Sequence, residues 1–213
     1  MNKARFEAFS DGVYAFAITL LVLGFAVPMH GDLKWPGDGE LSRELLKLWP
    51  NVIAYGLSFG VIGIMWQNHH ALFRTVSHID RRTVFFNLLL LSSTVFIPFA
   101  TATLGTYPTT HAATLLYGIV LSLCATWYNV ILLHLVRSRA FHDWLTPERI
   151  AGTIQAYRIG WVTYVTATLV ALLVPLASFA LYILIATYYV VPRGIDDDLD
   201  AGRERAKSRE LNQ

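Results

Sequence analysis

The chain has 213 residues, of which 54% are hydrophobic and 15% are charged, well below the roughly 25% charge of an average soluble domain. This composition excludes a disordered chain and a highly charged soluble enzyme, and the formal net charge of +2 argues against a partner made of nucleic acid. The only cysteine, Cys124, excludes an internal disulfide and a cysteine-based zinc site.

Apolar stretches separated by clusters of charge predict an all-α membrane protein with six transmembrane helices. A helix needs about 20 apolar residues to cross a hydrocarbon core of ~30 Å. Six stretches reach or approach that length: residues 4–27, 51–73, 83–104, 112–136, 157–174 and 175–191. Pro175 divides one long apolar run into the last two, because proline breaks helical hydrogen bonding. We therefore expect a tight turn at residues 173–178.

The distribution of lysine and arginine predicts the orientation of these helices. The N-terminus, the loops after the second and fourth stretches and the C-terminal tail together hold 14 of the basic residues, whereas the opposite side holds 3. Basic residues accumulate on the cytoplasmic side, so both termini are predicted to be cytoplasmic. Residues 1–192 form the predicted transmembrane domain, and residues 193–213 form a charged cytoplasmic tail.

The first stretch carries a polar pair, Ser10 and Asp11, inside an apolar run. A charged residue there is costly, faces the protein interior or water, and is often functional. The alternative is that Asp11 only pairs with a neighbouring helix to fix the packing. Both roles are compatible with each other.

Successive helical residues turn by ~100°, which sorts the side chains of this stretch into faces. The polar pair lies on the flanks, and Thr19 lies at the edge of a largely apolar stripe. The stripe consists of Arg5, Phe9, Gly12, Phe16, Leu20 and Leu23.

The second stretch ends with Trp66, Asn68, His69 and His70, at a depth similar to that of Asp11. Indole and imidazole N–H groups are donors that a buried carboxylate needs. Adjacent histidines diverge by ~100° on a helix and do not easily share one metal ion, so we expect no metal site and no cofactor. A G-x-x-x-G pattern at Gly56 predicts close helix packing.

The motif formed by Arg5, Phe9, Ser10 and Asp11 resembles the first-helix signature of the transmembrane-protein-175 potassium channel family, in its prokaryotic branch. The run from Gly12 to Leu23, the Trp66–His70 segment and the segment from Asn87 to Thr101 extend the resemblance over the first half of the chain. It implies a homotetramer in a prokaryotic plasma membrane, with potassium ions and the lipid bilayer as partners. It also implies a central pore lined by the first helix, and neither that family nor this chain has a TVGYG filter.

The resemblance assigns two groups of site residues. The pore constrictions would be Phe16, Thr19, Leu20 and Leu23, with Phe16 standing where the family usually has Ile or Leu. A structural polar network would hold the helix, and its members would be Arg5, Phe9, Ser10, Asp11, Trp66, Asn68, His69 and His70.

Two other functions remain open from the sequence. One is a non-conducting scaffold or a transporter built from the same helices. The other is an intramembrane enzyme or haem protein that uses His69, His70 or His134, although no catalytic signature occurs in the sequence and we expect no enzyme.

Overall fold

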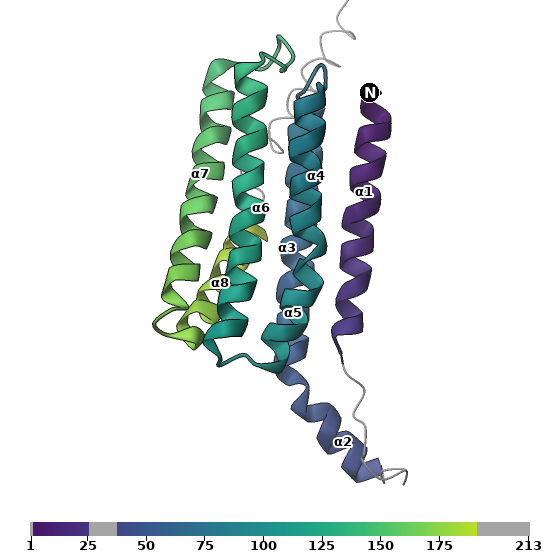
Figure 1. Ribbon diagram of the computed structural model, residues 1–213, viewed down its shortest axis with the longest axis vertical. Helices are drawn as coiled ribbons and strands as arrows, with labels where there is room; N and C mark the ends of the chain where they lie inside the picture. Colours follow the sequence, from purple (N-terminus) through teal and green to yellow (C-terminus); the bar gives the residue numbers. More distant parts are fainter. Residues whose placement is uncertain (1, 26–37, 191–213) are drawn as a thin grey trace, which may run out of the picture.

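The computed structural model describes residues 2–25 and 38–190, and these residues fold almost entirely into helices (Figure 1). The tail at residues 193–213 and the end of the first apolar stretch lie outside the described residues. The helices are α1 (Lys3–Leu20), the 3-10 helix η1 (Leu21–Gly24), α2 (Asp38–Lys47), α3 (Trp49–Arg74), α4 (Arg81–Val95), α5 (Ile97–Thr106), α6 (His111–Arg137), α7 (Pro147–Val170) and α8 (Pro175–Val190).

Several helices begin at residues that satisfy their free backbone N–H groups. The side chains of Asn2, Asp80 and Thr110 accept hydrogen bonds from the first turns of α1, α4 and α6. These residue types are the preferred N-caps because a short side-chain oxygen reaches those groups. Proline in the first turn starts α3, α5 and α7, where its missing N–H costs nothing.

Among residues 2–25 and 38–190, four helices are long and apolar enough to cross a membrane. They are Lys3–Gly24, Trp49–Arg74, Arg81–Thr106 and His111–Arg137. The segment Pro175–Thr187 is a shorter apolar helix. An all-helical membrane fold is therefore present, and the count of six spans stays a prediction.

The fifth and sixth predicted spans differ from expectation in their bounds. The helix α7 begins at Pro147, ten residues before the predicted start, because its first turns are polar and were not counted as membrane-spanning. It ends at Val170, and α8 begins at Pro175, so the turn occupies residues 171–174. The two helices are therefore separated just before Pro175, as predicted, but the turn begins two residues before the expected range of 173–178.

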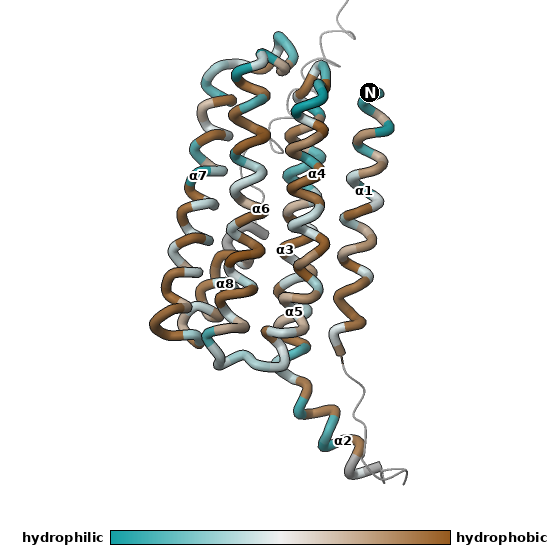
Figure 2. Tube along the Cα trace, in the orientation of Figure 1, coloured by the Kyte–Doolittle hydropathy of each residue, from teal (hydrophilic) through white to brown (hydrophobic). Residues whose placement is uncertain are grey.

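The helices form an elongated bundle with α1 at one edge and α7 at the other (Figure 1). The helix α1 packs on α3, α4 and α5, while α6 packs on α4, α5 and α7. The helix α8 lies against α3, α6 and α7. Hydrophobic residues run along the bundle, and polar residues gather at the upper loops and in α2 (Figure 2).

The start of α1 and two loops are joined at the upper end of the bundle. The Lys3 ammonium donates to the carbonyl of Val76 at 2.7 Å. The N–H of Ser77 donates to the carbonyl of Ala140 at 2.8 Å, so the α3–α4 loop is joined to the α6–α7 loop. The predicted cytoplasmic loops therefore meet at one end of the molecule, together with the N-terminus.

Two further features were not predicted from the sequence. The helix α2 is an additional amphipathic helix before α3. The glycines Gly56, Gly60 and Gly63 do not mediate close packing within the described chain, because a Cβ added at any of them would meet no heavy atom within 4 Å.

Candidate functional site

The helix α1 has a buried face and an exposed face. Its buried residues, Phe6, Ser10, Tyr14 and Ala17, recur every three or four positions and pack into the bundle. The exposed face includes Phe9, Gly12, Phe16, Thr19 and Leu23, with Leu20 half-buried at its margin. Phe16 is 58% exposed and Leu23 is 75% exposed. The stripe from the helical wheel is therefore the side of α1 that this chain leaves uncovered.

A directional chain of hydrogen bonds joins α3, α4 and α1. The Asn87 amide donates through Nδ2 to Ser10 Oγ at 3.0 Å, and Ser10 Oγ donates to the carbonyl of Phe6 at 3.0 Å. The Asn87 Oδ1 lies 2.9 Å from His69 Nε2. Because an amide oxygen only accepts, His69 carries a proton on Nε2.

The imidazole of His69 is enclosed by aromatic rings. Phe6 stacks on it with ring centroids 6.0 Å apart, Phe73 lies at 4.6 Å, and Tyr14 makes a T-shaped contact at 5.5 Å. His69 is 1% exposed. The enclosure and the bond from Nε2 to Asn87 are typical of a packed structural histidine.

The second polar contact of α1 joins Asp11 to Trp66. The indole Nε1 donates to Asp11 Oδ1 at 2.9 Å. The exposed ring of His70 stacks on Trp66, with centroids 6.2 Å apart and planes inclined by 26°. Ser10 and Asp11 therefore point to different neighbours, and together they fix the rotation of α1 about its axis.

The remaining predicted network residues lie elsewhere. Arg5 and Phe9 are on the exposed side of α1. The side chain of Asn68 is rotated by about 200° around the axis of α3 from that of Trp66. It lines a cavity between α3, α6 and α7. The structure therefore brings together Ser10, His69 and Asn87 in one group and Asp11, Trp66 and His70 in another.

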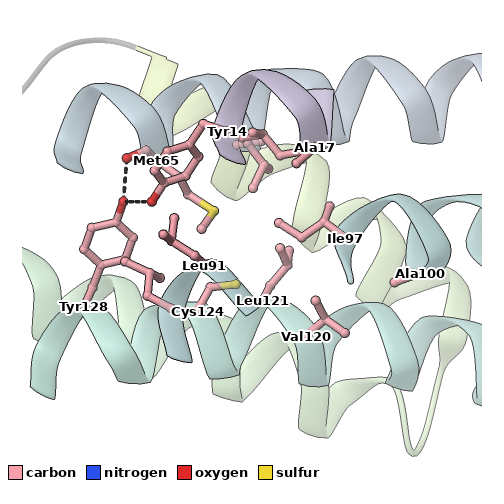
Figure 3. Packing of buried hydrophobic residues seen from close by; sticks show 14 of the residues in the cluster. Tyr14, Ala17, Met65, Leu91, Ile97, Ala100, Val120, Leu121, Cys124 and Tyr128 are labelled. Atoms are coloured by element: carbon pink, nitrogen blue, oxygen red, sulfur yellow. Dashed lines mark hydrogen bonds between the residues drawn. The ribbon is translucent and has the colours of Figure 1, made fainter. Parts of the chain in front are cut away.

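Sequence reasoning missed three buried members of this region. Tyr14 and Tyr128 share a hydrogen bond of 2.8 Å, and the Tyr128 hydroxyl lies 2.5 Å from the carbonyl of Met65 (Figure 3). Asn87 was the most visible of the three, because it is a lone amide inside an apolar run. Among the described residues, no group of three or more His, Cys, Asp or Glu side chains is arranged to hold a metal ion.

Outside the bundle interior, Asp80 joins the start of α4 to the end of α6. Its Oδ1 accepts from the Thr83 N–H at 2.7 Å and from the Thr83 hydroxyl at 2.6 Å, and Oδ2 lies 3.0 Å from His134 Nε2. Partial desolvation acts to raise the pKa of Asp80, but the hydrogen bonds from Thr83 and His134 outweigh it and lower that pKa to about 2.

Known proteins resemble this chain over most of its length. A potassium channel from Streptomyces collinus is 39% identical over 199 residues, which cover 89% of this chain and 92% of that protein. The family profile described as endosomal/lysosomal potassium channel TMEM175 matches residues 5–98. The chain belongs to the TMEM175 family.

Two other members show how far the similarity extends. The crystal structure of a lysosomal potassium-selective channel TMEM175 homologue from Chamaesiphon minutus has a TM-score of 0.79 and 32% identity, over 89% of this chain and 96% of that one. The endosomal/lysosomal proton channel TMEM175 of Homo sapiens is 39% identical over 103 residues, 47% of this chain and 20% of that protein. These TMEM175 proteins are named as channels rather than enzymes.

Proposed function

We propose that the chain is a potassium-permeable cation channel of a prokaryotic cell membrane, formed by four copies with α1 innermost. One observation carries this proposal: α1 directs its Ser10 and Asp11 side chains to α4 and α3 of its own chain and leaves Phe16 and Leu23 uncovered. Closed symmetry is the usual way to cover such a surface. The identity of the ion is inferred from the related proteins that are named as potassium channels.

In this arrangement residues 1–192 form a channel domain of six spans, and residues 193–213 form a cytoplasmic tail. The Lys3–Val76 and Ser77–Ala140 bonds support the topology, because they hold the N-terminus beside both predicted cytoplasmic loops. The basic residues of the tail belong to the same side by the positive-inside rule.

The exposed face of α1 supplies the chemistry of the proposed pore. Rings of apolar side chains at Phe16, Leu20 and Leu23 form constrictions that gate by dewetting. The Thr19 hydroxyl donates its hydrogen to the carbonyl of Phe16 at 2.8 Å. Its oxygen lone pairs are therefore available to a passing cation at the exposed side of the helix.

A pair of phenylalanines that are equally exposed provides the test. Phe16 and Phe85 are each 58% exposed, on α1 and α4 respectively. In vesicles that hold the purified protein, we expect Phe16→Ala to increase potassium flux and to bring the potassium–sodium reversal potential closer to zero, because a wider path admits a more hydrated ion. Phe85→Ala should change neither quantity. Equal flux in the wild-type protein and in Phe16→Ala would show that Phe16 does not line the pore.

The same preparations separate the channel from its alternative. A wild-type protein that forms stable tetramers but passes neither cation is a scaffold and not a channel. Cross-linking in mild detergent that stops at a monomer or dimer would contradict the four-fold pore.

A further inference from the structure

A partly open cavity lies between α3, α6 and α7, on the other side of α3 from the Trp66–Asp11 contact. Its volume is about 80 Å³. Its lining includes Val61 of α3, Leu121 of α6 and Tyr164 of α7 at one end, and Asn68, Asn129 and Tyr157 of the same helices at the other. We call this cavity the α7 groove.

The α7 groove lies at membrane depth. On α3 it extends from Val61 to Asn68, about 10 Å at a rise of 1.5 Å per residue. A helix of 26 residues such as α3 is about 39 Å long and therefore exceeds a hydrocarbon core of ~30 Å by about 4–5 Å at each end when centred. Asn68 lies six residues before Arg74, so it is placed just inside the boundary between hydrocarbon and head groups.

The groove has a polar end and an apolar end. The Asn129 amide donates through Nδ2 to the carbonyls of Ala125 at 2.9 Å and Tyr157 at 3.2 Å. Within the part of the chain that the structure describes, the side-chain amide of Asn68 forms no hydrogen bond. Since α3 and α6 run in one direction and α7 in the other, both amides lie toward the end that holds the α3–α4 loop.

The C-terminal segment of the chain does not match this groove. Residues 193–213 contain Asp196, Asp197 and Asp198 followed by alternating basic and acidic residues. Burial of such charges among apolar side chains is strongly unfavourable. The matching occupant is a molecule with a long apolar part and a polar group at one end.

We propose that the α7 groove binds the ester-proximal part of one acyl chain of a membrane phospholipid from the leaflet at the α3–α4 loop. The chain runs from Asn68 toward Leu121, and its ester carbonyl accepts a hydrogen bond from the Asn68 amide. Phospholipid surrounds the helices at this depth, and its ester carbonyls lie at the boundary where Asn68 is placed. This inference depends on membrane insertion and not on ion conduction.

Native mass spectrometry of the purified full-length protein, titrated with dioleoyl phosphatidylglycerol, tests the site. We expect one tightly held phospholipid per subunit. Ala156→Leu, which places a larger side chain in the groove, should lower the occupancy about tenfold. Ala151→Leu is the matched control, because Ala151 is an exposed alanine of the same helix outside the α7 groove, and it should bind as the wild type does.

A second variant keeps the test decisive if Ala156→Leu fails to fold. Asn68→Leu leaves the groove apolar and removes its donor, so binding should weaken about five- to tenfold, as expected for one lost hydrogen bond. Equal retention of lipid by Asn68→Leu and the wild type would overturn the proposed orientation, and equal retention by folded Ala156→Leu would overturn the site.

Ala156→Cys in a Cys124→Ala background locates the bound lipid, because Ala156 is an exposed residue that lines the groove whereas Cys124 is buried. Added phosphatidylglycerol should slow the reaction of this new thiol with an apolar maleimide about fivefold in the delipidated protein. If the lipid has no effect on this rate but deletion of residues 193–213 raises it, the tail occupies the groove and the lipid proposal is wrong.

Discussion

The indole N–H of Trp66 on α3 donates to the Asp11 carboxylate on α1 across 2.9 Å. The two residues are 55 positions apart in the sequence, and their bond connects a charged side chain of α1 to α3. The bond is accepted by one carboxylate oxygen, Oδ1. A neutral amide at position 11 can therefore keep the hydrogen bond while it removes the charge.

We expect Asp11→Ala to lower the melting temperature of the detergent-purified protein and to reduce its assembly. The loss should correspond to about 0.5–1.5 kcal/mol, the net contribution of one hydrogen bond, because Trp66 is partly exposed. Asp11→Asn retains an oxygen for the indole and should melt within a few degrees of the wild type. If the two variants are equally unstable, the negative charge matters more than the bond.

Asn87→Leu should lower the stability of the folded protein, although leucine and asparagine are similar in size. It removes both bonds of the Asn87 amide and strands the Nε2–H of His69 among aromatic rings, which costs about 1–3 kcal/mol. Thermal unfolding followed by circular dichroism measures the effect. Ser93→Ala is the control on the same helix, because the Ser93 hydroxyl donates to the carbonyl of Leu89 in its own helix, and it should unfold almost as the wild type does.

Acid should weaken the link between α4 and α6. The pKa of Asp80 is about 2 in the folded protein against an ordinary value of 3.8, so the ionised form is favoured by folding. Its contribution is complete above pH ~4 and is lost as the pH falls toward 2. The melting temperature should decrease across that interval.

Asp80→Asn keeps an N-cap oxygen for α4 but cannot ionise. It should therefore melt lower than the wild type at pH 6 and show a shallower decrease between pH 4 and pH 2. A pH dependence as steep as that of the wild type would assign the acid sensitivity to another group.

A glycine pair tests the packing of the last three helices. A Cβ on Gly118 of α6 would collide with the Tyr182 hydroxyl and with Thr168 Oγ1, whereas a Cβ on Gly152 of α7 would meet nothing within 4 Å. Gly118→Ala should therefore lower the melting temperature sharply by separating α7 and α8 from α6. Gly152→Ala should leave it unchanged or raise it slightly, because alanine favours a helix by about 1 kcal/mol over glycine. Equal effects would show that α6 and α8 move apart without cost.

The sequence predicts the direction of side chains within one helix well, because the 100° step is a local property. Phe9, Gly12 and Phe16 lie together on the exposed side of α1 for this reason. The break after Val95 was predictable too, since Pro98 falls in the first turn of α5. The assignment of Phe16, Thr19, Leu20 and Leu23 to a pore stays a prediction.

Partners between helices were not predictable in the same way. A wheel gives no information about the rotation of the neighbouring helix, so Trp66, His69 and His70 were all possible partners of Asp11. In the structure His69 is hydrogen-bonded to Asn87 instead, and Asn68 faces α6 and α7. The helix α2 was missed because a helix of ten residues with five charged side chains has no apolar run to reveal it.

The separation of α1 into two faces has a consequence for how relatives of this chain can differ. Ser10, Tyr14 and Asp11 fix the rotation of the helix from one side. Side chains on the other side, such as Phe16, can therefore change in size without turning the helix or opening a hole in the bundle. We expect homologues to tolerate variation in bulk at this position while the backbone of α1 stays where it is, so that permeation can diverge between species without a new fold.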